Sequence, residues 1–183
     1  MTQLYSPLPN KKYDIIYADP PWAYRDVEFV IDGETSSVED HYPTLKLPQL
    51  KELPVWDIAK KDCLLFMWST GPKLDEAIPL LTSWKFKYAT VGFVWNKVLC
   101  HPGYYTLGST EYVLIGKRGK IPQPRGARNI RQFLELKRTK HSKKPIEIAE
   151  RIDQMFPTQS KIELFARSKY KDWDVWGNQA PVE

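Results

Sequence analysis

Histidine and cysteine are scarce in this 183-residue chain, which has three histidines and two cysteines. A structural zinc site needs about four Cys or His ligands close together, so we expect no metal site. Cys63 and Cys100 lie in the apolar segments "DCLLFMW" and "NKVLCHPG". We expect both to be buried or partly buried, without a disulfide between them, as is usual in a reducing compartment.

Long apolar runs are also missing. No segment approaches the roughly 20 apolar residues that a membrane-spanning helix needs. The N-terminal "MTQLYSPLPNKKY" lacks the apolar core of a signal peptide. These absences predict a cytoplasmic protein without membrane contact. With 42% hydrophobic residues, the chain is expected to fold as one domain over residues 1–183, a length that can bury a substantial core.

Acidic residues are nearly absent from residues 117–144, which hold eleven Lys or Arg and one acid, Glu135. The rest of the chain carries a net negative charge. Such asymmetry favours a surface that faces a polyanion such as nucleic acid. An ordinary solvated loop face is the alternative. Arg125 and Arg128 in "PQPRGARN" are expected to be exposed and to contact phosphates, so that binding weakens with salt.

Short apolar runs alternate with segments of helical periodicity. The runs predict strands because they are aliphatic or aromatic and bounded by turn formers: Tyr13–Ala18, Cys63–Trp68, Tyr88–Trp95, Glu111–Ile115 and Lys161–Phe165. Helical spacing is found in residues 46–61, 71–84 and 144–156, although Pro54 breaks or bends the first. In the second, the expected buried face is Leu74, Ala77, Ile78 and Leu81. The alternation predicts an α/β fold with a mainly parallel sheet flanked by helices.

The segment "YDIIYADPPWAY", residues 13–24, ends a strand-like run in Asp19, Pro20, Pro21 and Trp22. Parallel sheets bind ligands at the carboxyl ends of their strands, where these residues fall. A carboxylate there is costly unless it is partnered, and two prolines leave carbonyls in fixed directions. A simple turn with a core tryptophan is the alternative. The polar stretch that follows, residues 25–42, is expected to be a mobile loop over the site.

These groups suit methyl transfer to the exocyclic amine of adenine. The amine is a poor nucleophile because its lone pair is delocalised into the ring. A carboxylate accepting one N–H and a rigid carbonyl accepting the other would favour a pyramidal nitrogen with its lone pair aimed at an electrophilic methyl group. Catalysis would come from alignment and from stabilisation of the developing positive charge. Trp22, with Tyr24 nearby, could stack on a base drawn out of its helix.

The chain here resembles the adenine-N6 methyltransferases with an Asp-Pro-Pro-Trp signature, a family that includes the eukaryotic RNA adenosine methyltransferases and small phage and bacterial enzymes. Seven segments in the family's order carry the resemblance over nearly the whole chain, among them "CLLFMWSTGPKLDEAIPLLTSWKFKY", "GFVWNK" and "KIELFARSKYKDWDVWGNQ". It implies a Rossmann-like fold in permuted order, with the catalytic motif N-terminal and the cofactor strand "KIELFAR" C-terminal. That order fits the absence of an N-terminal GxGxxG motif.

The resemblance also implies S-adenosylmethionine as cofactor. Asp19 and Pro20 would bind the target amine, and Asp19 would lie near the methionine end of the cofactor, as would Lys144. The implied cofactor contacts are Asp19, Lys144, Arg167, Ser168, Lys169, Asn178 and Gln179. Glu163 is expected to orient Arg167 or the turn rather than to touch the cofactor. Tyr104 and Tyr105, on a glycine-flanked loop, could face the flipped base or the nucleic-acid backbone, with plain packing as the alternative.

DNA is the expected substrate, because the chain is too small to carry the extra RNA-recognition regions of the large eukaryotic members. RNA is the first alternative, and cytosine-N4 methylation is a further one. A catalytically silent nucleic-acid-binding partner subunit is an alternative of another class. A homodimer or a partner methyltransferase chain is compatible with the limited basic surface of one small domain. The compact chain is consistent with a bacterial or phage-infected host cell.

Overall fold

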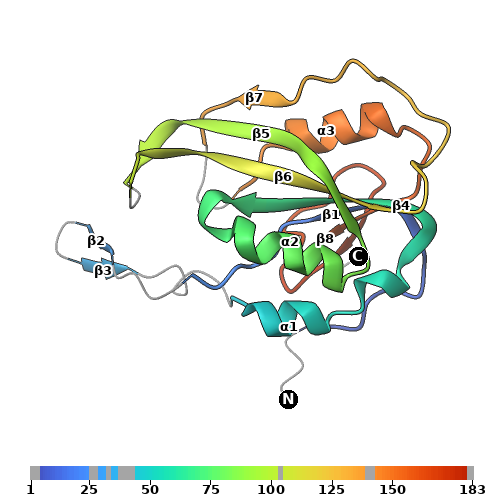
Figure 1. Cartoon of the computed structure of the whole chain (residues 1–183), viewed down its shortest axis with the longest axis horizontal. Coiled ribbons are helices and arrows are strands. Elements are labelled where there is room, and N and C mark those ends of the chain that lie inside the picture. The colour runs from blue at the N-terminus through green and yellow to red at the C-terminus, as the bar shows by residue number, and fades with distance from the viewer. Residues whose placement is uncertain are drawn as a thin grey trace.

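A computed structural model describes residues 5–24, 29–31, 34–36, 44–102, 105–138 and 143–180 of the chain. Its main feature is a seven-stranded sheet of order β7-β5-β6-β4-β1-β8-β9 (Figure 1). The strands are β1 (Tyr13–Ala18), β4 (Ala59–Thr70), β5 (Lys87–His101), β6 (Gly108–Arg118), β7 (Phe133–Glu135), β8 (Lys161–Leu164) and β9 (Asp174–Trp176). A separate small sheet pairs β2 (Phe29–Ile31) with β3 (Glu34–Ser36).

The central strand β1 lies between β4 and β8 and runs parallel to both. The pairs β8–β9 and β5–β7 are also parallel, whereas β6 is antiparallel to its neighbours β4 and β5. The prediction of an α/β fold with a mainly parallel sheet is therefore confirmed. The order along the chain is the permuted one, because the Asp-Pro-Pro-Trp motif follows the first strand and the late strand β8 lies beside it.

Helices cover both faces of the sheet (Figure 1). Helices α1 (Leu47–Glu52) and α2 (Leu74–Ser83) lie on one face and α3 (Ile146–Met155) on the other. Two short 3-10 helices, η2 (Val55–Asp57) and η3 (Gly71–Lys73), precede β4 and α2. The break expected at Pro54 is confirmed, because α1 ends at Glu52 and only the short η2 is helical between it and β4. Leu53 is extended (φ −66°, ψ 123°), as the following Pro54 favours, and the chain then enters β4.

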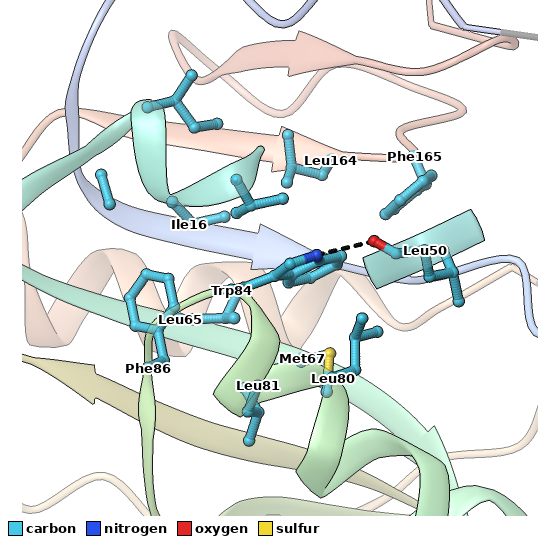
Figure 2. Packing of buried hydrophobic residues seen from close by; sticks show 14 of the residues in the cluster. Ile16, Leu50, Leu65, Met67, Leu80, Leu81, Trp84, Phe86, Leu164 and Phe165 are labelled. Carbon is cyan, nitrogen blue, oxygen red and sulfur yellow. Dashed lines mark hydrogen bonds between the residues drawn. The ribbon is translucent and has the colours of Figure 1, made fainter. Parts of the chain in front are cut away.

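Two apolar cores result from the alternation of side chains along β1. Ile16 and Ala18 belong to the core beneath α1 and α2, whereas Ile15 and Tyr17 belong to the core beneath α3. Figure 2 shows the first core around Trp84, which is fully buried. Its indole N–H donates to the carbonyl oxygen of Leu50 at 2.9 Å and so joins the end of α2 to α1.

Two local predictions differ from the structure, and two strands were missed. Ile78 is 41% exposed and Leu80 is buried in its place, so the predicted inner face of α2 was wrong at that position. Cys100 is exposed, whereas Cys63 is buried as expected, and both thiols are free. The three-residue strands β7 and β9 were not predicted, because so short a segment carries little periodicity.

The stretch over residues 25–42, predicted to be a loop, contains both strands of the small β2–β3 sheet. The rest of that stretch lies outside the described residues, so a lid function for it stays a prediction. Within the described ranges, no helix is both long and apolar enough to cross a membrane.

Candidate active site

The Asp19–Trp22 motif turns away from the sheet immediately after β1. The Pro20 carbonyl accepts a hydrogen bond from the Trp22 N–H (2.8 Å), and the Pro21 carbonyl accepts one from the Leu45 N–H (2.8 Å). A carbonyl oxygen has two lone pairs, so the Pro20 carbonyl can accept a second hydrogen bond. The prolines have no N–H of their own to satisfy. The turn therefore holds the Asp19 carboxylate and the Pro20 carbonyl in a fixed relation.

Trp22 is itself part of the core, with 5% of its surface exposed. Its indole N–H donates to the backbone oxygen of Trp68 near the end of β4, at 3.2 Å. The residue also lines the pocket that begins at Asp19. Trp22 thus serves as a packing residue and as one wall of the pocket, and stacking on a base stays a prediction.

Four charged side chains from separate elements meet beside this turn. The Lys144 ammonium, just before α3, lies 3.2 Å from Asp19 Oδ1 and 2.9 Å from Glu111 Oε2 on β6. The other oxygen of Glu111 lies 3.2 Å from the Lys97 ammonium on β5. Cations and anions alternate along this chain of contacts, so the network is neutral overall. Every member is largely buried, with between 13% and 21% of its side chain exposed.

Burial and ion pairing shift the pKa values of these groups in different directions. Burial raises the pKa of Asp19 above its usual value, the charge of Lys144 opposes that rise, and Glu111 adds to it. Burial would also raise the pKa of Glu111, but Lys144 and Lys97 outweigh burial and lower it. Although burial disfavours its charge, Asp19 and Glu111 raise the pKa of Lys144. Lys144 is therefore the main group that favours the ionised form of a buried Asp19, and Arg167 adds to its effect.

Aromatic side chains form the walls around the network. The Lys144 ammonium lies 5.3 Å from the centroid of the Trp68 ring, a distance at which cation and ring attract. The Trp68 indole N–H donates to the Tyr17 hydroxyl. The Tyr24 hydroxyl shares a 3.0 Å hydrogen bond with the Thr70 hydroxyl at the end of β4. These contacts fix the rings at the carboxyl ends of β1 and β4.

The resulting first pocket has a volume of about 380 Å³ and is open to solvent. Its walls combine the acid, the two prolines, three aromatic rings and polar groups of β4 and β6. The lining residues are Asp19, Pro20, Pro21, Trp22, Tyr24, Trp68, Ser69, Thr70, Glu111, Lys144 and Arg167.

A second pocket of about 340 Å³ adjoins the first and shares Asp19, Pro21 and Arg167 with it. Its other lining residues are Tyr5, Phe165, Asn178 and Gln179. The Asn and Gln amides can each donate and accept hydrogen bonds, and the two rings are apolar. The set fits a molecule with hydroxyl groups, a flat ring and a positive charge near Asp19, and S-adenosylmethionine has these features.

The floor of the second pocket requires an unusual backbone. Phe165, directly after β8, has φ of +61°, which costs energy for a residue with a side chain. The Ala166 N–H donates to the Trp176 carbonyl at 3.0 Å. At Gly177 a Cβ atom would lie 2.9 Å from the Ala166 nitrogen, so only glycine permits this close approach. The close contact places Asn178 and Gln179 beside the end of β8.

The structure brings together most of the residues implied as functional. Asp19, Pro20, Pro21, Trp22, Tyr24, Lys144 and Arg167 all line the first pocket, and Asn178 and Gln179 line the second. Lys144 lies in the first pocket and is not among the residues that line the second. Ser168 and Lys169 are exposed and line neither pocket. Their predicted cofactor contacts stay predictions.

The proposed phosphate-binding arginines are at the other end of α3. The Arg125 guanidinium lies 5.7 Å from the Phe156 ring centroid, and the adjacent Gly126 N–H donates to the Met155 carbonyl at 2.9 Å. Arg125 is half-buried rather than exposed as expected, and Arg128 is exposed. Neither lines the pockets, and phosphate contact by these residues stays a prediction.

Of the two tyrosines predicted to face nucleic acid from the hairpin loop, the structure describes one. Tyr104 lies outside the described residues. Tyr105 is fully exposed, so plain packing, the alternative considered for it, is excluded in this structure.

Sequence reasoning missed several residues of the site. Glu111 and Lys97 complete the charge network, and Trp68 is a pocket wall as well as a buried core residue. Glu111 carried one local signal, a carboxylate inside the strand-like run "EYVLI", where a charge needs a partner. Among the described residues, no group of three or more His, Cys, Asp or Glu could hold a metal ion.

Comparison with known proteins agrees with the sequence resemblance. The family model MT-A70 matches residues 13–179. The chain is 47% identical over 194 residues to the type II methyltransferase M.MunI from Mycoplasma sp., and the match covers 99% of this chain and 83% of the relative.

More distant relatives come from plants and animals. The chain is 28% identical to an N(6)-adenosine-methyltransferase MT-A70-like protein of Arabidopsis thaliana, with 91% of this chain and 24% of the relative covered. It is 27% identical to the N(6)-adenosine-methyltransferase catalytic subunit METTL3 of Homo sapiens, with 92% and 28% covered. The chain thus spans about a quarter of these larger proteins.

Proposed function

The chain belongs to the MT-A70 family, and from this premise we propose that it transfers a methyl group from S-adenosylmethionine to the 6-amino group of adenine in DNA. One observation carries the proposal. The Asp19 carboxylate lies where the two pockets meet, paired with Lys144 at 3.2 Å. A base in the first pocket and a methyl donor in the second would therefore meet at this acid.

The first pocket supplies two acceptors for the two N–H bonds of the amine. Asp19 accepts one N–H, and the Pro20 carbonyl accepts the other with its second lone pair. Because both acceptors are fixed by the turn, they orient the nitrogen lone pair before the reaction rather than during it. Glu111, held between two lysines, is a further wall of the same pocket.

The second pocket would hold the cofactor, which supplies a methyl group on a positively charged sulfur. Asn178 and Gln179 would bind its hydroxyl and ring-nitrogen groups, and Tyr5 and Phe165 would contact its flat ring. Asp19 faces both pockets. Its negative charge favours the positive sulfur of the cofactor and, as the reaction proceeds, the positive charge that develops on the amine. In the transfer the nitrogen–carbon bond forms, the carbon–sulfur bond breaks, and the amine then releases one proton to solvent or to Asp19.

DNA is favoured over RNA by the 47% identity to M.MunI, because that relative is named a type II methyltransferase and this class acts on DNA. The larger relatives are named adenosine methyltransferases, so RNA is the substrate to be tested against DNA. A silent partner subunit is disfavoured by the intact acid, prolines and lysine, which such a chain would have no reason to keep together.

The test is a nucleoside assay by mass spectrometry. Purified protein is incubated with labelled S-adenosylmethionine and with unmethylated DNA or RNA in separate reactions. We expect 6-methyl-deoxyadenosine from DNA with the wild type and none with Asp19→Ala, whereas Asp172→Ala, at an exposed acid, should retain activity. Thermal melting of all three proteins controls for folding. A product from RNA alone would reject the DNA substrate, and full activity of Asp19→Ala would reject the mechanism.

A further inference from the structure

The tip of the β5–β6 hairpin carries an unusual concentration of exposed apolar side chains. Nine large hydrophobic residues are exposed in the described part of the chain, and four of them lie within residues 98–107. They are Val98 (50% exposed), Leu99 (46%), Tyr105 (100%) and Leu107 (69%). Such a cluster on a soluble surface marks an interaction site.

The tip lies next to the first pocket. Val98 directly follows Lys97, whose ammonium pairs with Glu111 of the pocket at 3.2 Å. Leu107 precedes Glu111 by four residues, which is roughly 13 Å along a strand. In Figure 1 the hairpin extends beyond the sheet on the left, the side toward which the chain leaves β1. A nucleic acid with one base in the pocket would therefore pass the tip within a few base pairs.

The backbone of the tip is shaped for projection rather than for pairing. The β5–β6 register is broken between Asn96 and His101. Val98 has φ of +69°, and its N–H donates to the Asn96 side-chain oxygen at 3.1 Å. A β-branched residue adopts this conformation at a cost, and here the result is that Val98 and Leu99 are exposed instead of continuing a ladder.

Positive charge at the same edge indicates what the tip contacts. Strand β7 runs parallel to the end of β5, and the Leu136 N–H donates to the Asn96 carbonyl at 3.1 Å. Lys137 follows directly and is exposed, as is Lys143 beside the network lysine. Exposed cations beside an apolar tip fit a polymer with phosphates outside and stacked apolar faces inside. A second copy of this chain would bring the same positive charge against them.

We propose that the β5–β6 tip is a wedge that enters the DNA duplex beside the target adenine and occupies the space that the extruded base leaves. This inference rests on the proposed function, because it requires an adenine to leave its stack and enter the first pocket. Extrusion costs stacking and pairing energy, and apolar side chains inserted between base steps are a known way to offset it. Tyr105 and Leu107 carry the wedge, since they are the two most exposed members.

The test compares a tip variant with a matched surface variant on two duplexes. The variants are Tyr105→Ser/Leu107→Ser and the control Ile78→Ser/Tyr88→Ser, which alters exposed apolar residues outside the tip, the pockets and the basic segment. The target site is first located by sequencing DNA that the wild type has methylated. One synthetic duplex then pairs the target adenine with thymine, and the other places an abasic position opposite it, so that extrusion costs less.

We expect the tip variant to lose about 10- to 100-fold in kcat/KM on the paired duplex and to recover most of it on the abasic duplex. The control variant should match the wild type on both. With 2-aminopurine in place of the target adenine, the rise in fluorescence on extrusion should be weaker for the tip variant alone. Equal losses on both duplexes, or no loss on either, would overturn the wedge.

Two further outcomes are decisive. Sedimentation that shows a wild-type dimer and a monomeric tip variant, with equal losses on both duplexes, would make the tip a contact between copies. A wild type that methylates no DNA when the target site is to be located would remove the proposed function and this inference with it. An active wild type with an unaffected tip variant would remove the wedge alone.

Discussion

From the charge network we predict opposite shifts in the pH dependence of activity for two variants of the first pocket. Lys144→Met removes the main cation that favours ionised Asp19, whereas Glu111→Gln removes an anion that disfavours it. A protonated Asp19 would donate a hydrogen bond instead of accepting one from the amine. Activity should therefore be lost as pH falls through the pKa of Asp19. That acid limb should move to higher pH in Lys144→Met and to lower pH in Glu111→Gln.

The size of the effect follows from the geometry. Unit charges 3.2 Å apart, the distance between the Lys144 ammonium and Asp19 Oδ1, attract by roughly 5 kcal/mol at an effective dielectric constant of about 20. Partial exposure of both side chains, 21% and 18%, admits water and reduces this to about 2–3 kcal/mol. At a pH on the acid limb, kcat/KM for Lys144→Met should fall by roughly 30- to 150-fold relative to wild type.

The assay is initial-rate methylation of DNA at several pH values, with thermal melting to confirm that each variant is folded at each pH. Lys144→Arg is the matched control because it keeps the charge, and its acid limb should stay close to that of the wild type. A loss in Lys144→Met that is equal at every pH would show that Lys144 acts on binding alone. Shifts of both variants in the same direction would refute the argument from the network.

Three other predictions concern stability and cofactor binding. Trp84→Ala should lower the free energy of unfolding by about 3–5 kcal/mol. Trp84→Phe, which mainly loses the hydrogen bond to Leu50, should lower it by only about 1–2 kcal/mol. Urea unfolding measures both values, and equal losses would contradict this separation of packing from hydrogen bonding. Burial, and then Asp19, raise the pKa of Glu163 to about 7 from 4.5, so the folded state binds its proton more tightly and stability is lost as pH rises from 4.5 through 7. Glu163→Gln should then stabilise the cofactor-free protein by up to about 3 kcal/mol at pH 8 and by little at pH 4, and a gain independent of pH would contradict this. Replacing Gln179 by Ala should weaken S-adenosylmethionine binding about tenfold in calorimetry without changing the melting temperature, and unchanged affinity would remove it from the cofactor site.

The parts of the site that lie close together in the sequence could be predicted from it. Strand β1 has the predicted bounds, and Asp19 follows it at the carboxyl edge of a mainly parallel sheet. The pairing of Glu111 with Lys144 could not be predicted, because the two residues are 33 positions apart and meet only through the antiparallel placement of β6. A single sequence contains the charges but not which of them are neighbours.

The basic run over residues 117–144 shows the same limit. Along the sequence it looks like one positive surface. In the structure its first half passes the C-terminal end of α3, where Arg125 packs on Phe156, and its second half reaches the pocket edge, where Lys144 pairs with Asp19. Between these two halves the chain forms β7, a three-residue strand that no periodicity indicates. Charge density therefore suggested the type of partner but not its position.

The position of Asp19 between the two pockets has a consequence for the order of events under the proposed function. A neighbouring positive charge stabilises the ionised form of a buried carboxylate whose pKa is raised. Ionisation of Asp19 and binding of a sulfonium therefore favour each other by linkage. After transfer the sulfur is neutral, and Asp19 no longer attracts it. The same charge that draws the methyl donor into the second pocket thus holds the product less tightly. Lys144 limits the size of this effect, because it already compensates the acid at 3.2 Å.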